Sequence, residues 1–401
     1  MAILRLQNPL LRYAWGAADF IPDLLGQKSD SDHPVAEMWI GAHAQAPSLV
    51  NGKDGKIPLD VFISRDPKAA LGQAAQLYNG KLPFLMKVLA AERPLSIQAH
   101  PSKLQAEKGF ARENRLGLAL DSPLRNYRDD NHKPELICAL TPFRALCGFR
   151  DHREIAANFR VAGLSGFFRT INALEQSPAQ SELRGFLLEL LNLPEPDRKD
   201  VFTTLFDAQD RMAALPAEIV RICRDLATHF PGDIGILAPL FLNIHKLRPG
   251  EALYLGPGVL HSYVEGAGIE IMANSDNVLR GGLTPKHVDV AELVNILDFS
   301  TAPRVKILPM SDSSDSVVYP CPAREFSLRC LDWIQRCETV WETENRPLLI
   351  ISVAGRFSLQ DKVTEVTLKK GDSVFVPANT GKIKIAGRGK LWQASVPADQ
   401  S

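Results

Sequence analysis

The stretch KLRPGEALYLGPGVLHSYVEG, from Lys246 to Gly266, decides the expected fold. Apolar and polar residues alternate along it, and a Pro-Gly turn is followed by a Gly-Pro-Gly turn just before His261, which is typical of short β-strands. A weaker copy, LKKGDSVFVPANTGKIKIAG, occupies Leu368–Gly387. Two such units predict duplicated double-sheet barrels of the jelly-roll or cupin type. The copy has no histidine at the place of His261, so a metal bound by the first unit is expected to be lost from the second.

The rest of the chain divides into segments with different patterns of apolar and polar residues. Residues 2–150 are predicted to be β-rich, with strands at Leu82–Leu89, Leu95–His100 and Leu136–Leu140. Residues 151–240 are predicted to be helical, because apolar residues recur there at spacings of three and four. Two segments carry this pattern, Glu182–Leu191 and Ala217–His229, and in the second one helical face holds Ile219, Ile222, Cys223 and Leu226. The expected class is therefore mainly β with a helical insertion.

Length and charge limit the function. At roughly 150 residues per domain, 401 residues predict two or three domains. The 46 basic and 46 acidic residues balance, which argues against nucleic acid or an anionic membrane as the main partner. The first residues lack the layout of a signal peptide, no apolar run approaches the ~20 residues of a membrane span, and the six cysteines are scattered. We therefore expect a cytoplasmic protein.

Gln98 and His100 are the first candidate metal ligands. Residues two apart on a strand point to the same face, so both side chains can reach one ion. An imidazole nitrogen and an amide oxygen are both acceptable around zinc, although glutamine is the less usual ligand. The alternative is that the two residues line a polar barrel interior.

The run YRDDNHKPE, Tyr127–Glu135, is too polar for a core segment. A solvated loop is the alternative, but its Pro-Glu leads directly into an apolar strand and so holds Glu135 at the strand entrance. A carboxylate there would partly neutralise a divalent cation held by Gln98 and His100. The neighbouring His132 and Lys133 are candidate proton carriers.

A third candidate segment runs from His261 to His287. His261 follows a turn at the expected mouth of the barrel, where ligand-binding residues are usual, although a structural hydrogen bond is the alternative. Arg280 and Lys286 can clamp a phosphate or sugar oxygen, or are plain surface charge. Glu270 and Asp276 are further acids in the segment. No phosphate loop, dinucleotide fingerprint or nucleophile elbow appears, so the residues predict a metal-assisted reaction on a small anionic molecule.

At these residues the chain resembles the type I mannose-6-phosphate isomerases. The resemblance runs through most of the chain and departs from the family at Ser262 and Gly281, where alanine is more frequent. Neither departure affects an expected ligand. The matching motifs are Tyr13–Gly16, AEMWIGAH at Ala36–His43, LPFLMKVL at Leu82–Leu89, LSIQAHPSK at Leu95–Lys103, YRDDNHKPE, and the segment His261–Lys286.

The resemblance implies one zinc ion per chain, held by Gln98, His100, Glu135 and His261. It implies that Arg280 is an active-site residue and that the pocket contains Ser96, Lys87, Lys133 and Lys286, with Trp15 assigned to the substrate. It also implies a discontinuous catalytic cupin barrel, formed by residues 1–150 and 241–310. A helical domain would occupy residues 151–240, and a C-terminal jelly-roll barrel without metal would occupy residues 311–401.

The implied reaction interconverts mannose 6-phosphate and fructose 6-phosphate through a cis-enediol. Lys133, acting as the neutral amine, is slightly preferred as the base over Glu270. His132 is expected to assist ring opening, and Asp276 to hold a hydroxyl or orient Arg280. The alternatives are a cupin isomerase of another aldose phosphate, such as glucose 6-phosphate, or a non-catalytic cupin that senses a sugar phosphate. The chain is expected to be a monomer.

Overall fold

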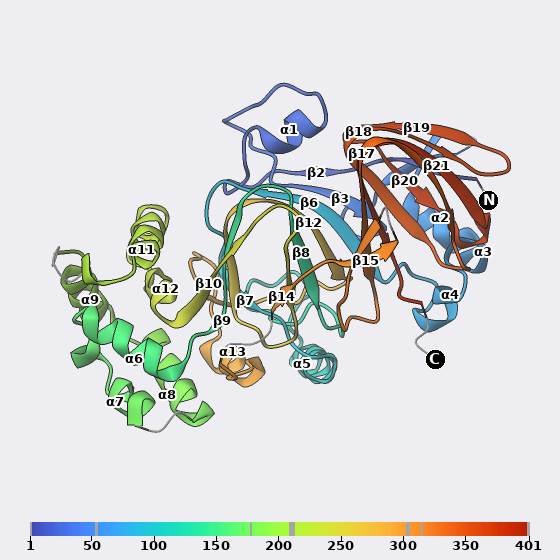
Figure 1. Cartoon of the computed structure of the whole chain (residues 1–401). Coiled ribbons are helices and arrows are strands. Elements are labelled where there is room, and N and C mark those ends of the chain that lie inside the picture. Colours follow the sequence, from blue (N-terminus) through green and yellow to red (C-terminus); the bar gives the residue numbers. More distant parts are fainter. Residues whose placement is uncertain are drawn as a thin grey trace.

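The computed structural model describes residues 2–52, 55–176, 179–207, 213–301, 305–313 and 316–398. A central barrel lies between a helical region and a second, C-terminal β region (Figure 1). The predicted class, mainly β with two cupin or jelly-roll barrels and an α-helical part, is confirmed. Within these ranges, no helix has the length and apolar character needed to cross a membrane.

Strand β12 (His261–Ala273) joins the two sheets of the central barrel. Its first residues pair with β9 (Phe143–Phe149) and β7 (Ile97–Ala99), and its later residues pair with β8 (Glu135–Ala139) and β6 (Phe84–Ala91). The change of sheet occurs near Gly266, whose φ is +114° and whose Cβ would stand 2.6 Å from the Pro142 carbonyl oxygen. Glycine therefore permits both the backbone conformation and the close approach.

The remaining strands of the barrel flank these five. One sheet runs β14-β11-β8-β12-β6-β3-β2, and the other joins β10 to β9 and β13 to β7. The predicted strands at Leu82–Leu89, Leu95–His100 and Leu136–Leu140 correspond to β6, β7 and β8, and each begins within two residues of its predicted start. The flanking strands are β2 (Leu10–Leu11), β3 (Glu37–Gly41), β10 (Leu242–Leu247), β11 (Ala252–Leu255), β13 (Leu279–Gly282) and β14 (Lys306–Ile307).

The helical region begins at α6 (His152–Val161) and ends at α12 (Ala238–Phe241). The predicted helix at Ala217–His229 is α11, with those bounds, and its four predicted apolar residues are buried. The core of this region includes Ile97 and Ala99 of β7, so the helices cover the outer face of one barrel sheet. The intervening elements are η1 (Ser165–Phe167), α7 (Thr170–Gln176), α8 (Gln180–Leu191), α9 (Glu195–Asp207) and η2 (Ile234–Leu237).

The C-terminal β region is completed by the start of the chain. Strand β1 (Leu4–Gln7) pairs with β20 (Ser373–Val376) and with β4 (Leu49–Gly52), which pairs with β5 (Gly55–Pro58). The predicted boundary at residue 311 stays a prediction, but N-terminal strands clearly extend the C-terminal sheet. Its other strands are β15 (Met310–Ser313), β16 (Ser316–Tyr319), β17 (Ser327–Glu342), β18 (Leu348–Gln360), β19 (Glu365–Lys369) and β21 (Lys382–Ser395).

The sheet containing β6, β8 and β12 is buried on both faces. Residues such as Val88 and Ile271 share a core with Leu349 and Trp392 of the C-terminal sheet. Alternate residues therefore point to the barrel interior, and these include charged side chains. Short helices on the periphery are α1 (Phe20–Leu24), α2 (Leu59–Arg65), α3 (Pro67–Leu71), α4 (Ala74–Leu77), α5 (Lys103–Arg115), α13 (Val290–Ile296) and η3 (Ala378–Thr380).

Candidate metal centre and active site

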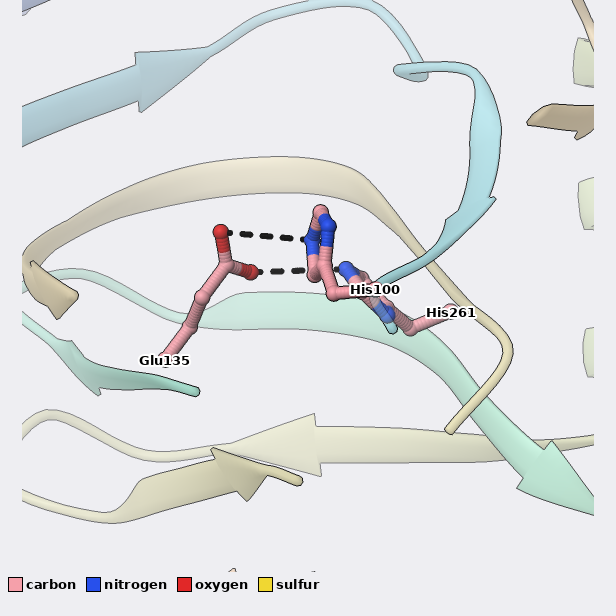
Figure 2. A group of neighbouring side chains, drawn as sticks. All are labelled: His100, Glu135 and His261. Atoms are coloured by element: carbon pink, nitrogen blue, oxygen red, sulfur yellow. Dashed lines mark ion pairs between the residues drawn. The ribbon is translucent and has the colours of Figure 1, made fainter. Parts of the chain in front are cut away.

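Three ligating side chains meet inside the barrel. Glu135 is the first residue of β8, His261 is the first residue of β12, and His100 directly follows β7. Their ligand atoms all lie within 4.8 Å of one another, and each residue is at most 2% exposed. Figure 2 shows the Glu135 carboxylate facing both imidazoles. Its Oε1 is 3.4 Å from His100 Nε2, and its Oε2 is 3.4 Å from His261 Nε2.

The hydrogen bonds of the two imidazoles prepare them for a cation. His100 Nδ1 is 2.7 Å from the Asn277 carbonyl oxygen, and His261 Nδ1 is 2.9 Å from the Val259 carbonyl oxygen. Each Nδ1–H is therefore a donor, which leaves the Nε2 lone pairs directed at Glu135. Both Nε2 atoms and Glu135 Oε2 are buried without a hydrogen-bond partner. A metal ion satisfies all three acceptors, and a His-His-carboxylate set with carbonyl-bound imidazoles fits zinc.

Burial and charge favour the metal-binding protonation states. Burial lowers the pKa of His100 to about 4, so its imidazole is neutral at pH 7. Burial alone would raise the pKa of Glu135, but Lys133 and His100 outweigh it and hold that pKa well below its usual range. The ammonium of Lys133 lies 3.1 Å from Glu135 Oε1. Neutral imidazole and ionised carboxylate are the forms that bind a metal.

Gln98 lies beside this cluster in the strand register. It is directly opposite His261 of β12 on one side and opposite Arg280 of β13 on the other. Paired residues send their side chains to the same face, so these three residues form one row in the barrel interior. The row brings Gln98, the predicted fourth ligand, and Arg280, the predicted active-site arginine, to the His100–Glu135–His261 cluster.

The cluster opens into a cavity of about 490 Å³. A buried network occupies its deeper part. Lys87 lies 3.0 Å from Glu270 and 3.5 Å from Glu37, and the Tyr263 hydroxyl donates to Glu270 Oε1 at 2.9 Å. The Trp39 indole N–H donates to Glu37 at 2.7 Å. Cavity residues include Tyr13, Trp15, Glu37, Lys87, Arg93, Ser96, Gln98, Lys133, Glu135, His229, Phe230, Tyr263, Glu270, Arg280, Thr284 and Lys286.

Two of the three charged residues in this network, Lys87 and Glu270, have raised pKa values, with different consequences for their protonation. Burial alone would lower the pKa of Lys87, but Glu37 and Glu270 outweigh it and raise that pKa, so Lys87 remains an ammonium. Burial raises the pKa of Glu270 despite the opposing effect of Lys87. A carboxylate with a raised pKa accepts a proton more readily than an ordinary one.

The more exposed part of the cavity is cationic. Burial, followed by repulsion from Arg128, lowers the pKa of Arg280. Burial, followed by repulsion from Arg280 and Arg128, lowers the pKa of Lys286. An anion bound between these side chains would relieve the repulsion. The end of α11 adds His229 and Phe230 to the wall, so the helical region contributes to the cavity.

Nine of the thirteen predicted site residues line this cavity, His100 and His261 lie beside it in the cluster with Glu135, and the other two lie elsewhere. His132 Nε2 is 2.7 Å from Glu325 Oε1, and His132 is not among the cavity residues. Asp276 accepts a hydrogen bond from Gln45 at 2.7 Å, lies 3.6 Å from His43, and is also absent from the lining. The predicted residues that do line it are Trp15, Lys87, Ser96, Gln98, Lys133, Glu135, Glu270, Arg280 and Lys286.

Sequence reasoning missed several cavity residues. Glu37 and Tyr13 lie within motifs quoted for the resemblance, and Tyr263 follows His261 at the same-face spacing of two. The motifs and the spacing of two could therefore have indicated all three residues. Arg93 and His229 had no such signal, because one follows a strand in a charged turn and the other ends a helix distant in sequence.

Known proteins resemble the chain in both sequence and structure. A family model described as phosphomannose isomerase type I, catalytic domain, matches residues 3–152, and one described as mannose-6-phosphate isomerase, cupin domain, matches residues 324–396. The mannose-6-phosphate isomerase of Escherichia coli K12 is 36% identical over 96% of this chain and 98% of its own length. The chain belongs to the type I phosphomannose isomerase family.

Solved structures agree with this membership. A mutant of the Salmonella typhimurium phosphomannose isomerase has a TM-score of 0.93 at 34% identity, covering 99% of this chain and all of the other. A zinc-bound mannose 6-phosphate isomerase has a TM-score of 0.91 at 34% identity with the same coverage. The family resemblance, the enzyme class and the cupin fold predicted from sequence are confirmed.

Proposed function

We propose that this phosphomannose isomerase family member interconverts mannose 6-phosphate and fructose 6-phosphate and uses one zinc ion per chain. The observation that carries the proposal is the buried His100–Glu135–His261 cluster opening into a cavity with cations at its more exposed part. Relatives named mannose-6-phosphate isomerases, including zinc-bound structures, support it.

Zinc would be held by Gln98, His100, Glu135 and His261. When bound there, it supplies a Lewis-acid charge that stabilises negative charge developing on substrate oxygens. The Asn277 and Val259 carbonyl oxygens keep the two imidazoles in the required tautomer.

The phosphate group is assigned to Arg280 and Lys286, with Ser96 as a hydroxyl donor. These residues line the same cavity. Burial and, after it, repulsion between cations lower the pKa values of Arg280 and Lys286, and a bound dianion would offset the repulsion. Arg280 also neighbours Gln98 in the strand register, so its guanidinium can also stabilise negative charge close to the metal ligands.

Proton transfer is assigned to the Glu270 carboxylate. After ring opening, this group takes the proton from the second carbon, a cis-enediol forms, and the proton returns to the first carbon. The raised pKa of Glu270 supports this role, and Tyr263 and Lys87 orient its two oxygens. The sequence slightly favoured Lys133, but its Nζ lies 3.1 Å from Glu135, and this contact suits a positioning and charge-stabilising role. No role at the reacting carbons is assigned to His132 or Asp276.

A coupled assay tests the proposal directly. Formation of fructose 6-phosphate from mannose 6-phosphate is measured before chelation, after chelation, and after zinc is added back. Activity that is lost and then restored supports both the reaction and the metal. A folded, zinc-loaded protein that turns over glucose 6-phosphate instead would support the alternative of a cupin isomerase that acts on another aldose phosphate. Binding of the substrate without exchange of its carbon-bound proton with solvent would support the alternative of a non-catalytic cupin that senses a sugar phosphate.

A further inference from the structure

A second cavity lies on the C-terminal barrel and shares no lining residue with the catalytic cavity. Its volume is about 570 Å³, which is in the range of small-molecule sites. Three arginines surround it. We call this cavity the arginine groove; it is lined by Ile334, Gln335, Arg336, Arg356, Phe357, Ser358, Thr367, Ala386, Gly387 and Arg388.

The strand register places two arginines of the groove and a lysine at its edge directly beside one another. Arg356 of β18 is opposite Arg388 of β21 on one side and opposite Lys369 of β19 on the other. Because paired residues project to the same face, three positive side chains stand in one row. All three are exposed, whereas the next residue, Phe357, is fully buried, so the row lies on the outer face of the barrel. Like charges directly opposite one another cost folding free energy.

A β-bulge adds a fourth cation. Trp333 of β17 pairs with Gly389, and Cys337 pairs with Gly387, so the three residues from Ile334 to Arg336 stand opposite Arg388 alone. Bulges redirect side chains and are frequent beside functional sites. This one brings Arg336 to the same groove as Arg356 and Arg388.

The carboxylates nearby are already engaged with other partners. Glu338 pairs with Lys384 at 2.9 Å, and Asp332 pairs with Lys390 at 2.9 Å. Glu365 accepts a hydrogen bond from Ser358 at 2.6 Å. Within the described ranges, no ion pair of 4.0 Å or less reaches Arg336, Arg356 or Arg388. Their guanidinium groups are therefore available to an external anion, and phosphate matches their fork geometry.

We propose that the arginine groove is a second ligand site, which binds a small molecule carrying two phosphate groups. Two phosphate monoesters carry roughly three to four negative charges near pH 7, which matches the four cations Arg336, Arg356, Arg388 and Lys369. Thr367 lines the groove next to the cationic row and adds a hydroxyl, whereas the Ser358 hydroxyl already donates to Glu365. The C-terminal barrel would thus bind a ligand without the help of a metal ion. This site is independent of the function proposed for the catalytic cavity.

Isothermal titration of the full-length, zinc-loaded protein with fructose 1,6-bisphosphate as the probe tests the site. We expect saturable binding that the double variant Arg356→Gln/Arg388→Gln weakens by roughly tenfold or more, because charge-assisted hydrogen bonds are lost. Two further double variants serve as controls. Lys108→Gln/Arg115→Gln removes the same charge from exposed positions of α5, and Arg280→Gln/Lys286→Gln removes cations from the catalytic cavity.

Retained binding in both control proteins, with loss only in the groove variant, supports the site. Equal weakening in the α5 variant would mean that the probe responds to net charge, and would overturn the proposal. Loss confined to the Arg280→Gln/Lys286→Gln variant would place the probe in the catalytic cavity and overturn it as well. Absence of saturable binding to the unaltered protein would have the same consequence. Thermal unfolding of each variant in the absence of probe verifies that it is folded.

Discussion

The ammonium of Lys87 lies 3.0 Å from Oε2 of Glu270, and both side chains are almost completely buried beside the His100–Glu135–His261 cluster. The two residues are paired directly across β6 and β12. Lys87 is also 3.5 Å from Glu37, so one cation stands between two carboxylates. The arrangement keeps Lys87 charged and holds Glu270 where it faces the cavity.

The Lys87–Glu270 pair predicts unequal effects on stability. Lys87→Met removes the cation that stands between Glu37 and Glu270 and leaves these two buried carboxylates without it, so it should lower the free energy of unfolding by about 3–5 kcal/mol. Glu270→Gln should cost less, because Lys87 keeps Glu37 as its partner. Urea denaturation of both variants at pH 7 measures the difference. If Glu270→Gln were the more destabilising change, Glu37 would not be an effective partner of Lys87.

The clustering of His100, Glu135 and His261 could be predicted from the sequence because each of them lies where a strand begins or ends. Glu135 follows a proline at a strand start, His261 follows a glycine turn, and Gln98 and His100 have the same-face spacing of a strand. Such patterns involve only neighbouring residues, so they can be recognised in the sequence without knowledge of the tertiary structure. The role expected for His132 had no comparable basis, because its ring contacts Glu325, which lies 193 residues away.

In the fold, too, contacts between residues distant in sequence could not be predicted. Alternation and turns predicted the strands from Lys246 to Gly266, but nothing local to Leu4–Gln7 indicates that this strand pairs with Ser373–Val376. Long-range pairing depends on which edge a strand finds after collapse, and one short strand fits several edges. The cavity residues contributed by the helical region, His229 and Phe230, were hidden for the same reason.

Gly266→Ala tests the turn of β12 from one sheet into the other. The new Cβ would meet the Pro142 carbonyl oxygen at 2.6 Å and Phe143 Cα at 2.8 Å, with φ at +114°. We expect a loss of roughly 1–3 kcal/mol in the free energy of unfolding, from backbone strain and overpacking. Gly232→Ala is the matched control, because Gly232 also has a positive φ, of +82°, but nothing lies within 4 Å of its Cβ position. Equal losses in the two variants would show that φ, and not the close approach, limits this position.

Glu251 predicts a specific pH dependence of stability. The Arg248 backbone N–H and the Lys306 ammonium lower the pKa of Glu251 to about 2, from an ordinary value of 4.5. Because the folded pKa is the lower one, the stabilisation is present above pH 4.5 and is lost as the pH falls towards 2. Glu251→Gln should therefore lower the Tm at pH 7, and the difference from the unaltered protein should shrink between these two pH values.

Thermal unfolding of metal-depleted protein between pH 7 and pH 3 checks the Glu251 prediction without interference from zinc release. Glu92→Gln is the control, because Glu92 is exposed and has no ion pair in the described part of the chain. The control should show no such convergence with falling pH. A Glu251→Gln difference that stays constant over the range would mean that the carboxylate titrates with its ordinary pKa in the folded state.

Glu135→Gln and Arg280→Ala should separate metal binding from catalysis. Glu135 is the only anionic member of the expected ligand set, so Glu135→Gln should reduce zinc content and isomerase activity together. Arg280 neighbours Gln98 in the register but supplies no ligand atom, so Arg280→Ala should keep zinc and lose activity by roughly 10²–10³-fold, as is typical for removal of one charge-stabilising donor. Metal analysis of the purified proteins and the coupled assay give the two readouts. Full zinc occupancy with retained activity in Glu135→Gln would refute the ligand assignment, whereas loss of zinc from Arg280→Ala would make Arg280 a structural support of the metal centre.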